Sequence, residues 1–94
     1  MTRDEFVEKL KGQLDELNGE IDKLEARYDA AESSVREQYR EQLADAKTQR
    51  ARAEKKLQEV RTAGEEAWED LKGDAEYTWK AFRDSVSYFK SRFR

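Results

Sequence analysis

Residues 68–93 read WEDLKGDAEYTWKAFRDSVSYFKSRF, and this stretch decides the fold. Its large apolar residues recur at steps of three or four, which at about 100° per residue places them within roughly 80° of one another on a helical wheel. Most of the aromatic residues of the chain lie here. The stretch is therefore predicted to form an amphipathic helix, with an apolar stripe that another surface must cover. The stripe comprises Trp68, Leu71, Ala75, Trp79, Phe82, Val86, Phe89 and Phe93.

The composition around this stretch is that of a small helical protein. The chain has 94 residues, of which 44% are charged and 36% hydrophobic, with no proline and four glycines. Such a charged, proline-free composition is typical of long helices and coiled coils. We expect one helical domain over residues 1–94, with little apolar material for a compact interior.

Residue types that carry most protein chemistry are missing. There is no cysteine and no histidine, so thiolate chemistry and the commonest general base and metal ligand are absent. Neighbouring carboxylates such as Glu69 and Asp70 point about 100° apart on a helix. The chain is predicted not to be an enzyme and to use no cofactor or metal. Because it lacks a signal-like start and any apolar run of about 18 residues, we expect a cytoplasmic protein.

A second apolar seam runs through the first third of the chain, from Val7 to Val35. Its steps alternate between three and four without interruption, which is a heptad pattern. Thr2 and Glu5 have the spacing of a capping box and predict a helix start. The members of this seam are Val7, Leu10, Leu14, Leu17, Ile21, Leu24, Tyr28, Ala31 and Val35.

Beyond Val35 the steps become four and four, through Tyr39 to Leu43, and a weaker seam of small residues then leads to Leu57 and Val60. The step change is a stutter, which unwinds a supercoil locally without ending the helix. Ser34 and Glu37 form a second possible capping box. Residues 29–32 contain no glycine or proline, however, so one continuous helix is predicted here.

The predicted turn lies at residues 63–64. Gly64 is expected to end the long helix in a left-handed conformation, and Thr62 with Glu65 could cap the next helix. The acidic residues that follow Gly64 suit the positive end of a helix dipole.

The predicted fold is all-α: an elongated antiparallel helical hairpin of the coiled-coil type. Helix one spans about residues 2–62 and helix two about residues 65–92, or about 90 Å and 42 Å at 1.5 Å per residue. Helix two covers only part of helix one, so residues 7–24 would need a second chain, and we expect a homo-oligomer, a dimer or larger. The predicted helix–helix interface comprises Val7, Leu10, Leu14, Leu17, Ile21, Leu24, Tyr28, Val35, Tyr39, Leu43, Leu57, Val60, Trp68, Leu71, Trp79, Phe82, Val86, Phe89 and Phe93, with Gly64 at the turn.

The alternative fold is a three-helix bundle with breaks near Ser34 and Gly64. It would place the basic residues 77–94 beside the acidic residues 15–32. A compact monomer would favour this alternative over the hairpin.

Two functions remain open. The first is a non-enzymatic structural or interaction module that self-associates. The second is a reversible binder of anionic membrane surfaces, in which Lys72, Arg83, Lys90 and Arg94 flank the C-terminal stripe. Nucleic acid is not expected as a partner, because acidic residues interleave the basic patch at 50–61 and the chain carries a net charge of −3.

The run Gly64-Glu65-Glu66-Ala67-Trp68-Glu69-Asp70-Leu71-Lys72, followed by Trp79 and the ending Ser91-Arg92-Phe93-Arg94, resembles a family of small bacterial stress-response coiled-coil proteins. The heptad first half and the overall length are similar too. Bulky aromatics near the end replace the alanine-rich tail of that family. The resemblance implies a soluble bacterial protein with a stress-related role and no assigned enzymatic activity, and it supplies no catalytic residue or ligand.

Overall fold

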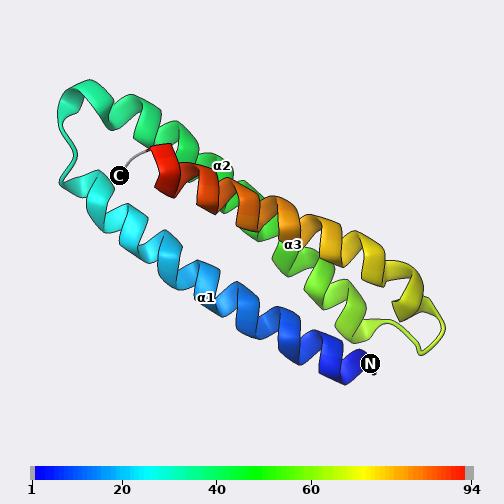
Figure 1. Ribbon diagram of the computed structural model, residues 1–94. Helices are drawn as coiled ribbons and strands as arrows, with labels where there is room; N and C mark the ends of the chain where they lie inside the picture. Colours follow the sequence, from blue (N-terminus) through cyan, green and yellow to red (C-terminus); the bar gives the residue numbers. More distant parts are fainter. Residues whose placement is uncertain (1, 93–94) are drawn as a thin grey trace.

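The computed structural model describes residues 2–92, which form three helices joined by two short loops. These are α1 (Arg3–Asp29), α2 (Ser33–Thr62) and α3 (Ala67–Arg92), and the described residues contain no strand. Figure 1 shows that α1 and α3 run in the same direction and α2 runs opposite to both. The Cα atoms occupy a rod of 51 × 18 × 17 Å. The chain is thus a three-helix bundle.

The predicted continuous helix over residues 2–62, and with it the two-helix hairpin, is wrong. The helix ends at Asp29, where the backbone N–H of Ala30 donates to Arg27 and that of Ala31 to Tyr28, both at 3.1 Å. These tightened last-turn bonds satisfy carbonyls that a helix end leaves free, so no glycine is required. Folding back here covers the seam of α1 within one chain, which avoids the entropy cost of recruiting a second.

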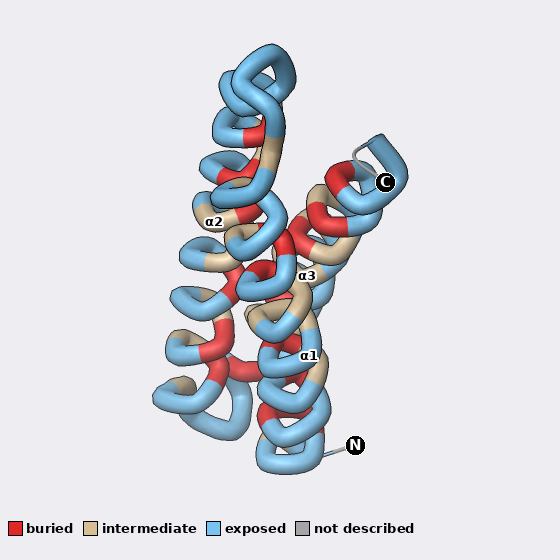
Figure 2. The backbone as a smooth tube through the Cα atoms, turned by 90° about the vertical axis from the view of Figure 1, so that its left-hand side faces the viewer, coloured by how far each residue is buried: buried red, intermediate tan, exposed pale blue. Residues whose placement is uncertain are grey.

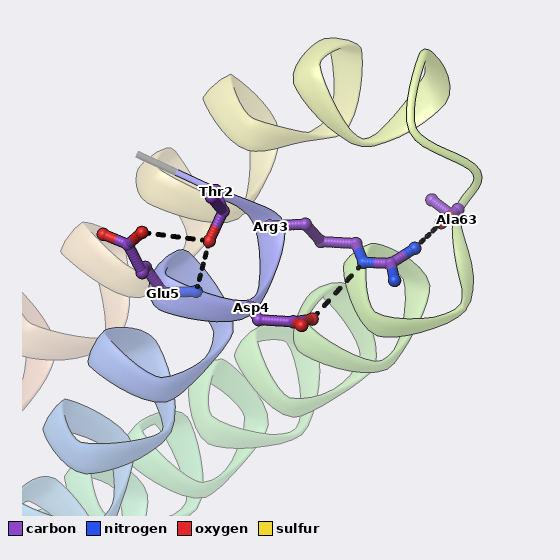
Figure 3. A network of polar contacts seen from close by, with 5 residues as sticks. All are labelled: Thr2, Arg3, Asp4, Glu5 and Ala63. Atoms are coloured by element: carbon purple, nitrogen blue, oxygen red, sulfur yellow. Dashed lines mark hydrogen bonds and ion pairs between the residues drawn. The ribbon is translucent and has the colours of Figure 1, made fainter.

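The first helix starts as its sequence predicts. The side-chain oxygen of Thr2 accepts a hydrogen bond from the backbone N–H of Glu5 at 3.2 Å, and the Thr2 hydroxyl donates to the Glu5 carboxylate at 3.2 Å (Figure 3). The second possible capping box, Ser34 with Glu37, does not form. Glu32 occupies the N-cap position of α2 and makes no side-chain cap bond.

The loop between α2 and α3 lies where the sequence predicts the turn, but its conformation differs. Gly64 does not have a positive φ, so the left-handed helix ending is wrong. The hydroxyl of Thr62 donates back to the carbonyl of Gln58 at 3.0 Å and does not cap α3. Instead, the Arg3 guanidinium donates to the carbonyl of Ala63 at 2.5 Å and also lies 3.7 Å from the Asp4 carboxylate (Figure 3). The start of α1 therefore holds this loop in place.

One apolar core runs along the length of the bundle. Figure 2 shows buried positions recurring along each helix while most of the remaining positions are exposed. None of the buried residues is polar or charged among those the structure describes. The fully buried large side chains come from all three helices: Ile21, Leu24, Val60, Phe82, Val86 and Phe89.

Ion pairs link neighbouring helices as the three-helix alternative predicts. Lys90 on α3 lies 3.2 Å from Glu20 on α1, so the basic end of the chain meets the acidic half of α1. Lys47 on α2 pairs with Glu25 on α1. These pairs are partly exposed, so each contributes about 0 to 1 kcal/mol and selects the arrangement more than it stabilises it.

Candidate interaction surface

Most residues of the predicted helix–helix interface lie inside this single-chain bundle. The seam of α1 and the stripe of α3 face each other and α2, so no second chain is needed to cover them. The buried members are Val7, Leu10, Leu14, Ile21, Leu24, Tyr39, Leu43, Leu57, Val60, Trp68, Phe82, Val86 and Phe89. The half-buried members are Leu17, Tyr28, Leu71 and Trp79.

Val35 is the one described member of the predicted interface that is exposed, whereas Gly64 lies at the turn as predicted. Val35 is 41% exposed, because it lies in the first turn of α2, beyond the level at which Arg92 of α3 contacts Gln38. Gly64 lies in an exposed loop. Phe93 lies outside the described residues.

Phe6 is a core residue that the heptad pattern does not include. It is 3% exposed and its ring lies 6.0 Å from that of Trp68, with the Lys72 ammonium 5.9 Å from the Phe6 ring centroid. A two-stranded coiled coil needs only a narrow seam, whereas α1 contacts both α2 and α3 and needs a wider apolar sector. Phe6 stands four residues before Leu10, and this spacing is the signal that could have identified it.

An aromatic cluster joins all three helices at the end of the bundle near the α1–α2 loop. The ring of Tyr39 stands edge-on to Phe89 at 4.6 Å and stacks on Tyr28 at 5.9 Å. The Tyr39 hydroxyl donates to the backbone carbonyl of Leu24 at 2.7 Å. Burial raises the pKa of this phenol above its ordinary value, and the positive charge of Arg27 opposes the shift. The Tyr39 hydroxyl therefore links α2 to α1.

A shallow groove of about 220 Å³ lies between α1 and α3. Phe6, Leu10 and Trp79 form its apolar part, and Lys9 and Lys80 are among its polar lining. The Trp79 indole N–H is buried and has no hydrogen-bond partner among residues 2–92, and the Arg83 guanidinium lies 4.9 Å from the Trp79 ring centroid. This groove is where α3 packs least closely, since its main contact is with α2.

The outward face of α3 differs from the rest of the surface. Tyr77 is 76% exposed and Tyr88 is 52% exposed, and they are the most exposed large hydrophobic residues among those the structure describes. They stand eleven residues apart, which is about three helical turns, so both point away from the core. The phenol of Tyr88 accepts a hydrogen bond from Arg92 at 3.0 Å.

We define the side of α3 that carries these two tyrosines as the α3 outer face. Its charged members are Lys80 and Asp84, and the exposed carboxylates of Asp70 and Glu76 lie beside it on the same helix. The Asp84 side chain is 61% exposed and makes one long contact, 3.4 Å, with the neighbouring Arg83. The α3 outer face consists of the exposed residues Gly73, Tyr77, Lys80, Asp84, Ser87, Tyr88 and Ser91.

No protein-family model, curated protein or solved structure matches the chain. Within residues 2–92, no helix is both long and apolar enough to cross a bilayer. The same residues bring together no group of three His, Cys, Asp or Glu side chains able to hold a metal ion.

Proposed function

We propose that the chain is a non-enzymatic interaction module that self-associates through the α3 outer face. The observation that carries this proposal is the exposure of Tyr77 and Tyr88 on the side of α3 that faces away from the core. Tyrosine offers a large rigid surface with a polar tip, and it is enriched in the central part of protein interfaces.

The route to self-association differs from the one that the heptad pattern predicts. Leu10, Leu14 and Leu24 are covered within the chain, so they do not recruit a partner. The α3 outer face is smaller and more polar than those seams. The expected complex is therefore weak and forms only at high protein concentration.

Sedimentation velocity from micromolar to millimolar concentration tests this proposal. The average mass of the unaltered chain should rise with concentration, and the double variant Tyr77→Ala/Tyr88→Ala should stay monomeric. Val35→Ala is the matched control, since Val35 is an exposed apolar residue in the first turn of α2. A chain that remains monomeric throughout the range would overturn the proposal.

A cytoplasmic, stress-related role in a bacterium is the part of this proposal that rests on the resemblance at residues 64–72. In the structure these residues form the α2–α3 loop and the start of α3, where Trp68 packs against Phe6. Their distinctive pattern thus has a role in packing. Measuring the cellular abundance of the chain after heat, osmotic and oxidative shock would test the physiological part.

Membrane binding through α3 is the second candidate function, and it requires the bundle to open. Phe82 and Phe89 are 0% exposed, so the apolar stripe reaches a lipid surface only if α3 leaves the bundle. Co-sedimentation with phosphatidylglycerol vesicles would separate the two functions. We expect no binding, whereas salt-sensitive binding with a change in tryptophan emission would favour the membrane function.

A further inference from the structure

We infer that the self-associated form is an antiparallel two-fold dimer in which the α3 outer face pairs with its own copy around Phe82. This inference rests on the proposed function and names the geometry of that complex. It follows from the order of residues along the face and from the charges of two of them.

The α3 outer face contains a second seam, opposite the buried stripe. Its positions are separated by steps of four, three, four, three and four, which is heptad spacing and keeps them in one line along the helix. All six residues are exposed. The seam runs Gly73, Tyr77, Lys80, Asp84, Ser87 and Ser91.

The spacing of this seam reads the same in both directions. In an antiparallel pair of helices, two residues lie opposite each other when their numbers add to a constant. With the two-fold axis at residue 82, the constant is 164. Every seam position then meets another seam position of the second chain, and none faces a gap.

The residues that meet in this arrangement are complementary. Lys80 lies opposite Asp84 of the second copy and Asp84 opposite its Lys80, so one pair of residues supplies two ion pairs. Tyr77 lies opposite Ser87, a large side chain against a small one. Gly73 lies opposite Ser91, where two small residues let the helices approach closely. Two-fold symmetry makes every such contact occur twice.

A parallel pairing of the same seam is unfavourable. It would place Lys80 against Lys80 and Asp84 against Asp84, and it would stack the large Tyr77 side chains at one level. Like charges placed directly opposite one another favour the alternative arrangement. The charges therefore select the antiparallel orientation.

Side chains within the chain leave this seam accessible. A Cβ added at Gly73 would meet nothing within 4 Å, so no neighbour in the bundle fills the space above it. The Arg83 guanidinium lies over the ring of Trp79, which lines the groove toward α1, and so it stays on that side of α3. Lys80 and Asp84 are both exposed, and Lys80 stands between this seam and the groove toward α1, which it also lines.

Charge reversal tests the pairing. We would measure the dimer dissociation constant by sedimentation velocity for Lys80→Glu, Asp84→Lys and the double variant Lys80→Glu/Asp84→Lys. Each single variant turns both attractive pairs into repulsive ones and should weaken the dimer roughly tenfold or more. The double variant restores opposite charges across the axis and should return to the affinity of the unaltered chain.

Mixing the two single variants gives a further readout. The Lys80→Glu chain carries two acidic side chains on its seam and the Asp84→Lys chain carries two basic ones, so opposite charges face each other at both pairs. The mixture should associate more tightly than either variant alone. Circular dichroism of each variant at low concentration establishes that the bundle is intact, as expected for exposed positions on a helix.

The possible failures are distinguishable. If the unaltered chain never associates, both the proposed function and the proposed dimer are wrong. If it associates but both single variants keep full affinity, the chains pair through parallel α3 faces or through another surface. In a parallel dimer each single variant only replaces one pair of like charges with another pair of like charges. A double variant that stays as weak as the single variants would also overturn the antiparallel pairing.

Discussion

The hydroxyl of Tyr39 on α2 donates a hydrogen bond of 2.7 Å to the backbone carbonyl of Leu24 on α1. Tyr39 is only 3% exposed and its ring also contacts Phe89 on α3. One side chain therefore connects all three helices near the end where α1 turns into α2. This loop contains no glycine or proline, so contacts of this kind hold the chain in its folded-back form.

Replacing Tyr39 with phenylalanine should lower the free energy of unfolding by about 0.5 to 1.5 kcal/mol. The variant keeps the ring but removes the donor, and a net hydrogen bond contributes about this much. Tyr88→Phe is the matched control, because the Tyr88 hydroxyl is bonded at the exposed surface to Arg92. Urea unfolding followed by circular dichroism measures both. Equal losses in the two variants would mean that the Leu24 bond contributes little.

The stability of the bundle should fall at alkaline pH through the same residue. Burial raises the pKa of Tyr39 above its ordinary value of 10.0, so the unfolded chain loses this proton at a lower pH than the folded chain. The stabilisation is therefore complete below about pH 10 and declines as the pH rises through the folded-state pKa. Urea midpoints across this range should converge for the unaltered chain and Tyr39→Phe. A constant difference between them would contradict the prediction.

Phe82→Ala should destabilise the bundle by about 3 to 5 kcal/mol. Phe82 is 0% exposed and truncation would leave a cavity among helices that can only partly close it. In a small domain this is a large fraction of the total stability. Tyr77→Ala, on the opposite side of α3, should change stability by less than about 0.5 kcal/mol. Thermal unfolding at low concentration compares them, and a similar melting temperature for both would show that α3 faces the core differently.

Gly64→Ala should raise the melting temperature slightly. The sequence pattern predicts destabilisation, because alanine is strained in a left-handed helix ending. Gly64 does not have a positive φ, and a Cβ there would meet nothing within 4 Å. Alanine should then stabilise the fold by about 0.4 to 1 kcal/mol, because it lowers the conformational entropy of the unfolded chain. A fall in melting temperature would indicate that the loop adopts the left-handed turn.

Local sequence rules predict the helices and two of their boundaries but not the break at residues 30–32. Both the helix start at Thr2 and the loop around Gly64 are marked by local chemistry. The break after Asp29 carries no such mark, because burial of the α1 seam by the rest of the chain decides it. The break does change the apolar spacing, which becomes steps of four through Val35, Tyr39 and Leu43. The spacing changes there because α2 starts at Ser33 and its buried side begins anew.

The candidate interaction surface is also present in the sequence but could not be recognised there. The heptad pattern is defined on apolar residues, whereas the seam from Gly73 to Ser91 consists of small, charged and aromatic side chains. This seam can be recognised as an exposed surface only once the opposite side of α3 is known to be buried. Phe6 escapes the pattern for a related reason, since only a helix with two partners needs so wide an apolar sector.

An odd number of antiparallel helices means that the chain leaves the bundle at the opposite end from where it enters. In Figure 1, α1 begins at one end of the rod and α3 finishes at the other, and the rod is 51 Å long. A two-helix hairpin would return the chain to its starting point. The bundle can therefore serve as a rigid spacer that holds segments fused to its two ends about a rod length apart. In the antiparallel dimer, each end of the assembly would instead carry the start of α1 from one chain and the end of α3 from the other.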